Sequence, residues 1–137
     1  MATSQWATAV KIVSEHVVLI ETPSARGTGF VVQSPPGSAD SCVITAWHVI
    51  AHATEWREAI KLTHFPSGKQ LFLEPNAREI NPAIARDQAL VTFAPDALPL
   101  PKNRLPFHKV DIRYTEGVEM GWLGYPAVAP ANLCFFY

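Results

Sequence analysis

The sequence predicts an all-β fold in which six short strands form a small barrel. Prolines supply 12 of the 137 residues and are spread along the chain, so long helices are disfavoured and short strands joined by turns are favoured. Short runs of β-branched and aromatic residues lie between these breaks, at a spacing typical of a small barrel or sandwich. We favour a barrel because its closure leaves no unpaired strand edges.

Each predicted strand is a short apolar or alternating run that a turn or a polar stretch separates from the next. The six runs are residues 17–21, 27–33, 42–45, 59–64, 70–73 and 88–93. Two of the turns are Pro35-Pro36-Gly37 and Pro66-Ser67-Gly68. In the fourth run, apolar Ile60 and Leu62 alternate with polar residues, which is the period of a half-buried strand.

Two further segments have a helical pattern. Trp6, Val10, Val13 and Val17 recur at helical spacing, which predicts a short amphipathic helix over residues 1–15. We expect its apolar stripe to pack on the core rather than to bind a partner. Residues 46–52 follow the third strand as a short apolar turn that can also be helical.

The chain divides at a proline-rich segment. Residues 16–94 are predicted to form the first barrel, and residues 95–116, which are Pro-rich and non-periodic, a linker. Alternation resumes near Val118, so residues 117–137 are predicted to begin a second barrel. The run 132–137 has the composition of a buried strand rather than of a polar terminus, so we expect the sequence to be truncated inside that barrel.

Composition limits the class of protein and of partner. Hydrophobic residues make up 48% of the chain and charged residues 17%, which favours a folded domain over a disordered chain. The net charge is −1 and no basic run occurs, which disfavours a nucleic-acid partner. No apolar run approaches the roughly 20 residues that span a bilayer, and residues 1–6 do not resemble a secretion signal. We therefore expect a cytoplasmic protein with no membrane contact.

The cysteines and the paired histidines do not suggest a metal or a cofactor. Cys42 and Cys134 are too few for a disulfide framework, and we expect both to be buried thiols. His48 and His52 have a spacing that can bind zinc on a helix. The zinc-protease motif, however, requires glutamate directly after the first histidine, and Val49 stands there. We predict neither a metal nor a cofactor.

Four short motifs follow one another along the chain. Residues 27–32 are Gly-Thr-Gly-Phe-Val-Val, residues 45–49 are Thr-Ala-Trp-His-Val, residues 87–91 are Asp-Gln-Ala-Leu-Val, and residues 124–126 are Gly-Tyr-Pro. Together they resemble the G-[ST]-G-F, T-A-x-H-V, D-x-A-L-L and G-Y-P motifs of the trypsin-like serine peptidases, in particular their HtrA-like bacterial branch. The resemblance covers the chain from about residue 17 onward and implies a chymotrypsin-type double β-barrel.

The resemblance implies that His48 is the catalytic base and Asp87 the carboxylate that orients it. A serine hydroxyl is a poor nucleophile until a base removes its proton. A histidine, with an ordinary pKa of about 6.5, can accept that proton and then deliver it to the leaving amine. The carboxylate holds the other ring nitrogen and stabilises the imidazolium. We expect these two side chains to meet at the rim of the barrel.

The sequence departs from the family at the nucleophile. The 137 residues contain no G-x-S-G-G motif, which in the family supplies both the serine and the oxyanion hole. The single Ser-Gly pair, Ser67-Gly68, lies in a predicted turn. We therefore expect a serine endopeptidase fragment that is inactive alone and acts on polypeptide substrates when complete.

Other interpretations of the same residues stay open. His48 can be a structural group at the end of a strand, and Asp87 can form a surface ion pair with Arg86 worth at most about 1 kcal/mol. The whole chain can be a non-catalytic pseudo-peptidase barrel that acts as a protein-interaction module. A separate chain can also complement the second barrel.

Overall fold

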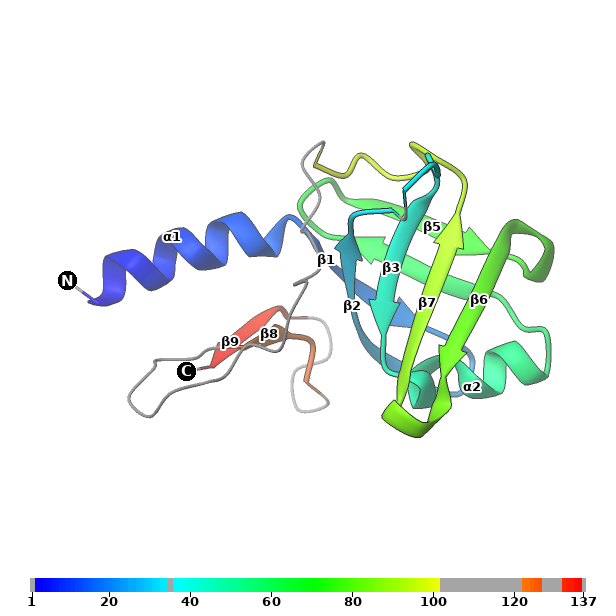
Figure 1. Ribbon diagram of the computed structural model, residues 1–137. Coiled ribbons are helices and arrows are strands. Elements are labelled where there is room, and N and C mark those ends of the chain that lie inside the picture. The colour runs from blue at the N-terminus through cyan, green and yellow to red at the C-terminus, as the bar shows by residue number, and fades with distance from the viewer. Residues whose placement is uncertain (1, 35, 102–121, 127–131, 137) are drawn as a thin grey trace.

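The computed structural model describes residues 2–34, 36–101, 122–126 and 132–136 (Figure 1). Most of the described elements are strands, which confirms the all-β fold class and its short N-terminal helix. The elements are α1 (Ala2–Ser14), β1 (Val17–Glu21), β2 (Arg26–Val32), β3 (Ser41–Thr45), α2 (Trp47–Glu55), β4 (Ile60–His64), β5 (Lys69–Leu73), η1 (Pro75–Ala77), β6 (Arg78–Ala83), η2 (Ile84–Arg86), β7 (Gln88–Phe93), β8 (Trp122–Gly124) and β9 (Cys134–Phe136).

Seven strands form one curled antiparallel sheet, a half-barrel, in the order β5-β4-β1-β2-β3-β7-β6. The expectation of six strands closed into a cylinder is therefore corrected in two respects. The sheet has a seventh strand, β6, and its edge strands β5 and β6 share no ladder in the described part of the chain. These two strands follow one another in sequence but stand at opposite ends of the strand order. The residues between Leu73 and Arg78 thus lead the chain from one edge of the sheet to the other.

Strand β6 was not predicted from the sequence because its composition is not typical of a strand. Its sequence is Arg-Glu-Ile-Asn-Pro-Ala, and most of its side chains are exposed. Pro82 cannot donate a backbone hydrogen bond, which an edge strand tolerates and a central strand does not. The six residues nevertheless pair in continuous register with β7, from Arg78 opposite Phe93 to Ala83 opposite Gln88. The ladder with β7 holds this strand, and Ile80 alone of its apolar side chains packs against the main core among the residues described.

The main hydrophobic core lies inside the curl of the sheet, under helix α2. Its largest fully buried side chains are Ile20, Ile50, Ile60 and Leu62. Burying each contributes about 1.5–3 kcal/mol. Gly29 lies where β2 passes close to its neighbours, and a Cβ there would lie 2.7 Å from side-chain atoms on both β1 and β3.

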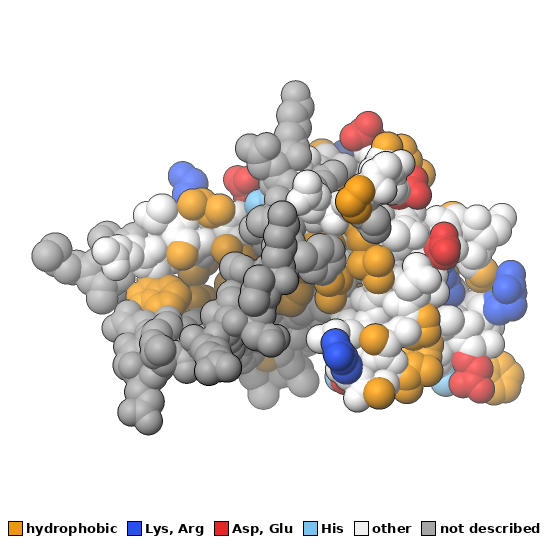
Figure 2. All heavy atoms as spheres, in the orientation of Figure 1, with side chains coloured by type: hydrophobic (Ala, Val, Ile, Leu, Met, Phe, Trp, Pro, Cys, Tyr) orange, Lys and Arg blue, Asp and Glu red, His pale blue; other side chains and the backbone are white. Residues whose placement is uncertain are grey.

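A second, smaller core joins helix α1 to the short β8–β9 sheet. Val10 and Val13 pack against buried residues of β1 and of the segment after β8, and the Trp6 ring lies 5.2 Å from that of Phe135. Figure 2 shows orange hydrophobic side chains along this side of α1. The apolar stripe of the helix therefore packs on the protein itself. His64, buried in β4, lies within 2.8 Å of the Glu15 carbonyl and ties the end of the helix to the main sheet.

The predicted linker and second barrel are described only in part. The linker predicted over 95–116 is described as far as residue 101, and most of the strand predicted near Val118 lies outside the described residues. The run 132–137 contains β9, which pairs with β8 in the register Trp122 opposite Phe136. The domain boundaries at 95 and 117 stay predictions.

The cysteines differ in burial. Cys42 is fully buried in β3, and burial raises the pKa of its thiol, with a smaller contribution from Asp40. Cys134 is only partly buried, so the expectation that both thiols are buried is wrong for this residue. Neither described helix is both long enough and apolar enough to cross a membrane.

Candidate functional site

The candidate site begins at an unusual helix start. Helix α2 starts at Trp47, directly after β3, and leaves backbone N–H groups without partners inside the helix. Ala46 precedes it and has no side-chain oxygen to accept from them. A residue 39 positions away accepts instead: the Trp47 N–H donates to the Asp87 carbonyl over 3.1 Å, and the His48 N–H donates to Asp87 Oδ1 over 2.8 Å. Asp87 therefore caps the helix that carries His48.

The two side chains that the motifs single out lie in contact. His48 Nδ1 is 2.6 Å from Asp87 Oδ2, so Nδ1–H donates to the carboxylate. In the neutral ring this leaves the lone pair on Nε2, which is the atom a general base uses. The His48 side chain is 73% exposed, so this nitrogen is open to a ligand. The structure brings these residues together, and their catalytic role stays a prediction.

Local backbone geometry fixes the position of Asp87. The residue ends the turn η2, where its N–H donates to the Ile84 carbonyl over 3.0 Å. Its φ of 50° lies in the left-handed region, which aspartate adopts more readily than most residues. Strand β7 follows at once, and its pairing of Ala89 with Thr45 brings the end of this turn to the start of α2. The β3–β7 register therefore sets the contact.

The hydrogen bonds at this helix start stabilise the ionised form of Asp87. The side-chain hydrogen bond from His48 is the largest cause, followed by the one from the His48 backbone N–H, and together they hold the pKa of the Asp87 carboxyl below its ordinary value of 3.8. A carboxylate at a helix N-terminus is also favoured by the helix dipole. The site thus keeps a negative charge beside the imidazole at neutral pH.

The glycine motif on β2 makes room for the histidine helix. A Cβ on Gly27 would lie 2.5 Å from Val49 Cγ2, a distance that real Cβ contacts essentially never show. Val49 follows His48 directly and is buried. Thr45, just before the helix, donates from Oγ1 to the Thr28 carbonyl over 2.9 Å. The first two motifs therefore pack directly against each other.

The fourth motif reaches the same place. The Tyr125 N–H donates to Thr28 Oγ1 over 2.8 Å, which joins the segment after β8 to β2. Tyr125 is buried, its ring lies 5.5 Å from that of Phe65, and burial raises the pKa of its hydroxyl to about 12. Tyr125 and His48 line one open depression of about 490 Å³, which we call the His48 depression. Residues of β2, the end of β3, the start of α2 and residues 86–88 complete its lining.

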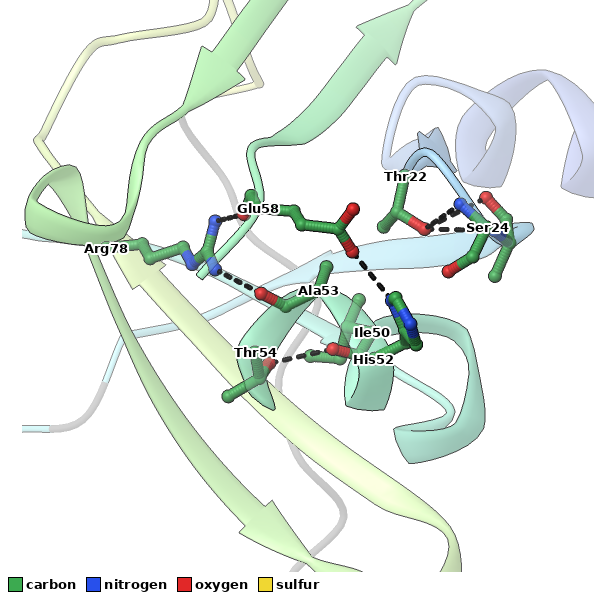
Figure 3. Close-up of polar contacts among 9 residues, drawn as sticks. Thr22, Ser24, Ile50, His52, Ala53, Thr54, Glu58 and Arg78 are labelled. Atoms are coloured by element: carbon green, nitrogen blue, oxygen red, sulfur yellow. Dashed lines mark hydrogen bonds and ion pairs between the residues drawn. The ribbon is translucent and has the colours of Figure 1, made fainter. Parts of the chain in front are cut away.

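The second histidine of the helix belongs to a separate pair. His52 Nδ1 is 2.7 Å from Glu58 Oε1, and Figure 3 shows the imidazole turned toward that carboxylate. In the part of the chain that the structure describes, no three His, Cys, Asp or Glu residues are grouped as metal ligands would be. His48 and His52 therefore have different carboxylate partners.

Arg78 is a structurally important residue that sequence analysis missed. Its guanidinium donates to three main-chain carbonyls, those of Glu58 (2.6 Å), Leu73 (2.7 Å) and Ala53 (3.2 Å). Figure 3 shows two of these bonds, to Glu58 and Ala53. The guanidinium thus joins the end of α2 to the bend between the two edge strands. No sequence motif marks such a contact, because its acceptors are backbone atoms from three segments.

Comparison with known proteins gives a structural likeness. No protein-family model matches the chain, and no curated protein matches it. The chain is similar to the crystal structure of Rv3671c from M. tuberculosis, described as a serine-to-alanine mutant in an inactive form, with a TM-score of 0.51 and 23% sequence identity. The likeness covers 92% of this chain and 50% of that one, so the chain spans about half the length of that protein. At this identity the likeness shows the fold alone, and that fold is trypsin-like.

Proposed function

We propose that this chain supplies the histidine and the aspartate of a trypsin-like serine endopeptidase that cleaves polypeptides by acyl transfer. The observation that carries the proposal is the contact of 2.6 Å between His48 Nδ1 and Asp87 Oδ2, in a largely exposed imidazole that lines the His48 depression. A structural histidine does not require that arrangement. The trypsin-like fold supports the proposal as well.

In the proposed reaction, a serine hydroxyl attacks the carbonyl carbon of a peptide bond while its proton passes to His48 Nε2. Asp87 stabilises the imidazolium that forms. The C–N bond breaks as His48 donates the same proton to the leaving nitrogen, and the acyl group stays on the serine. His48 then takes a proton from water as the water oxygen attacks the acyl-serine. It returns that proton to the serine oxygen as the ester bond breaks and the product acid leaves.

The proposal places the serine and its oxyanion hole on polypeptide outside these 137 residues, because no G-x-S-G-G motif occurs within them. Two sources would supply that motif. One is the reading frame beyond the codon for Tyr137, and the other is a separate chain that completes the second barrel. Sequencing downstream of that codon and identifying proteins that copurify with the chain distinguish the two.

The experiment is labelling with a serine-reactive fluorophosphonate. We expect no labelling of the 137-residue chain alone and stoichiometric labelling once the serine-bearing polypeptide is joined to it or mixed with it. His48→Gln should abolish labelling of the completed protein, because the hydroxyl then lacks its base. His52→Gln is the matched control, since it removes a histidine with the same kind of partner from the same helix, and should leave labelling unchanged.

Three outcomes contradict the proposal. Labelling of the chain alone would mean that the nucleophile lies within it. Labelling that survives His48→Gln would mean that His48 is not the general base. The absence of a serine-bearing polypeptide from both sources would favour the non-catalytic alternative, in which the half-barrel serves as a protein-interaction module.

A further inference from the structure

The His48 depression has more positively than negatively charged side chains, and these side chains differ in whether they have ion-pair partners. Besides His48, three side chains that are charged at neutral pH line it: Arg26, Arg86 and Asp87. Two are cationic and one is anionic, so the lining has a surplus of positive charge at neutral pH. Which of these charges is available to a ligand depends on the partners that each already has.

Two of the three charges are engaged. Arg26 Nη2 lies 2.5 Å from Glu21 Oε2. Lys61 Nζ lies 3.6 Å from Oε1 of the same carboxylate. The carboxylate of Asp87 accepts from both the ring and the backbone of His48. Arg86, in contrast, makes no ion pair or side-chain hydrogen bond with the described residues. Its guanidinium is therefore the charge of the depression that stays available.

The backbone that carries Arg86 is well held. Arg86 is the last residue of η2 and directly precedes Asp87, whose N–H and carbonyl are both hydrogen-bonded. The His48 side chain lines the same depression. A ligand that binds in the depression beside His48 is therefore exposed to the positive charge of Arg86, whose backbone is held in place. A guanidinium binds a carboxylate with two parallel N–H donors, a geometry that a single ammonium does not provide.

We propose that the His48 depression binds a polypeptide segment that carries a side-chain carboxylate, which Arg86 recognises. The inference rests on the proposed function, since it names the substrate class of that same site. It assigns to Arg86 a role in binding the substrate, separate from the proton transfers of His48. A free C-terminal carboxylate has the same chemistry, so the test includes it as a separate arm.

The test is an NMR titration of the 137-residue chain with three peptides. The first is acetyl-Ala-Ala-Glu-Ala-Ala-amide, the second has Gln in place of Glu, and the third is the Gln peptide with a free C-terminal carboxylate. We expect the Glu peptide to shift the amide resonances of His48 and Arg86 and to bind about fivefold more tightly than the Gln amide, which corresponds to one exposed ion pair. The preference should shrink at high salt.

Two variants with the same charge change locate the effect. Arg86→Gln should abolish the preference for the Glu peptide, whereas Lys69→Gln, on β5 and outside the depression, should preserve it. Equal binding of the Glu and Gln amides, or no binding of either, overturns the inference. A preference for the Glu peptide that survives Arg86→Gln overturns it too. A preference only for the peptide with the free C-terminus would mean that the depression binds the C-terminal carboxylate of a product, and it overturns the recognition of a side-chain carboxylate. Fluorophosphonate labelling that requires His48 would leave the proposed function intact in each case.

Discussion

The two ends of helix α2 carry chemically similar pairs that differ in their surroundings. His48 contacts Asp87 at the N-terminal end over 2.6 Å, and His52 contacts Glu58 at the C-terminal end over 2.7 Å. The distance between imidazole and carboxylate does not distinguish the two pairs. The first pair joins residues 39 apart in sequence and lines the His48 depression, whereas the second joins residues six apart and lies beside Trp56, whose ring stacks on that of His52 at 5.9 Å.

The difference lies in what else each carboxylate does. Asp87 caps the helix with both its carbonyl and its carboxylate, so the same residue orients the ring and holds the segment on which the ring is mounted. At the other end these tasks are separate, since Glu58 contacts the ring while Arg78 binds the helix carbonyl of Ala53. A histidine–carboxylate distance alone therefore does not distinguish the two pairs, whereas the capping of α2 by the carboxylate partner does.

The largest expected difference between the two ends is in activity. In the completed enzyme, Asp87→Asn should lower kcat by roughly ten-thousandfold, because the amide no longer selects the ring tautomer that leaves Nε2 free as a base. Glu58→Gln should change kcat by less than about twofold, since its histidine lies outside the depression. Peptide-hydrolysis kinetics measure both. A comparable loss in the two variants would show that the pairs are not functionally distinct.

The next largest effect concerns stability at the C-terminal end. Arg78→Met should lower the free energy of unfolding by about 3 kcal/mol, since hydrogen bonds from a charged donor are worth about 1.5–3 kcal/mol each and three carbonyls lose theirs together. Urea unfolding measures this, with Lys69→Met as the control for removing a surface charge. A change below about 1 kcal/mol would mean that water replaces the guanidinium at this bend without loss.

A smaller effect is expected at the N-terminal end, from crowding. Gly27→Ala should lower the free energy of unfolding by about 2 kcal/mol, because the added methyl overlaps Val49 and must displace the helix. It should also shift the His48 resonances, whereas those of His52 should stay in place. Adding Val49→Ala should restore the His48 resonances in the double variant. Failure of that rescue would argue that the glycine serves another contact.

The smallest expected effect is in the acid limb of stability. Hydrogen bonds from His48 lower the pKa of Asp87 in the folded chain, so its contribution to stability is fully present above its ordinary value of 3.8 and is lost as the pH falls through the lower folded value. The melting temperature of Asp87→Asn should therefore fall less than that of the wild type as the pH is lowered from 5 to 2. Calorimetry across that range tests the prediction, and an unchanged slope would contradict it.

Much of the fold was predictable because its strands have strong local patterns. Strands β1 to β3 and β7 were each predicted to within about a residue at either end, since buried β-branched runs between turns have few alternatives. Strand β6 was missed because its sequence is mostly polar and contains Pro82, and its extended conformation depends on the ladder with β7. Helix α2 was predicted only as a short apolar turn that could also be helical, because the residue that caps it, Asp87, is distant in sequence.

The sequence by itself determined the all-β class, the N-terminal helix and the pairing of His48 with Asp87 as candidates, because local periodicity and short motifs depend on neighbouring residues. Only the tertiary structure decided that Asp87 also caps α2, that Arg78 binds three carbonyls and that Arg86 is left with an available charge. Each of these depends on which backbone atoms and charges the β3–β7 register and the sheet bend bring together. The contacts of Arg78 with Glu58 and Ala53 cross 20 and 25 residues of sequence, and that of Asp87 with His48 crosses 39, so they have no local pattern.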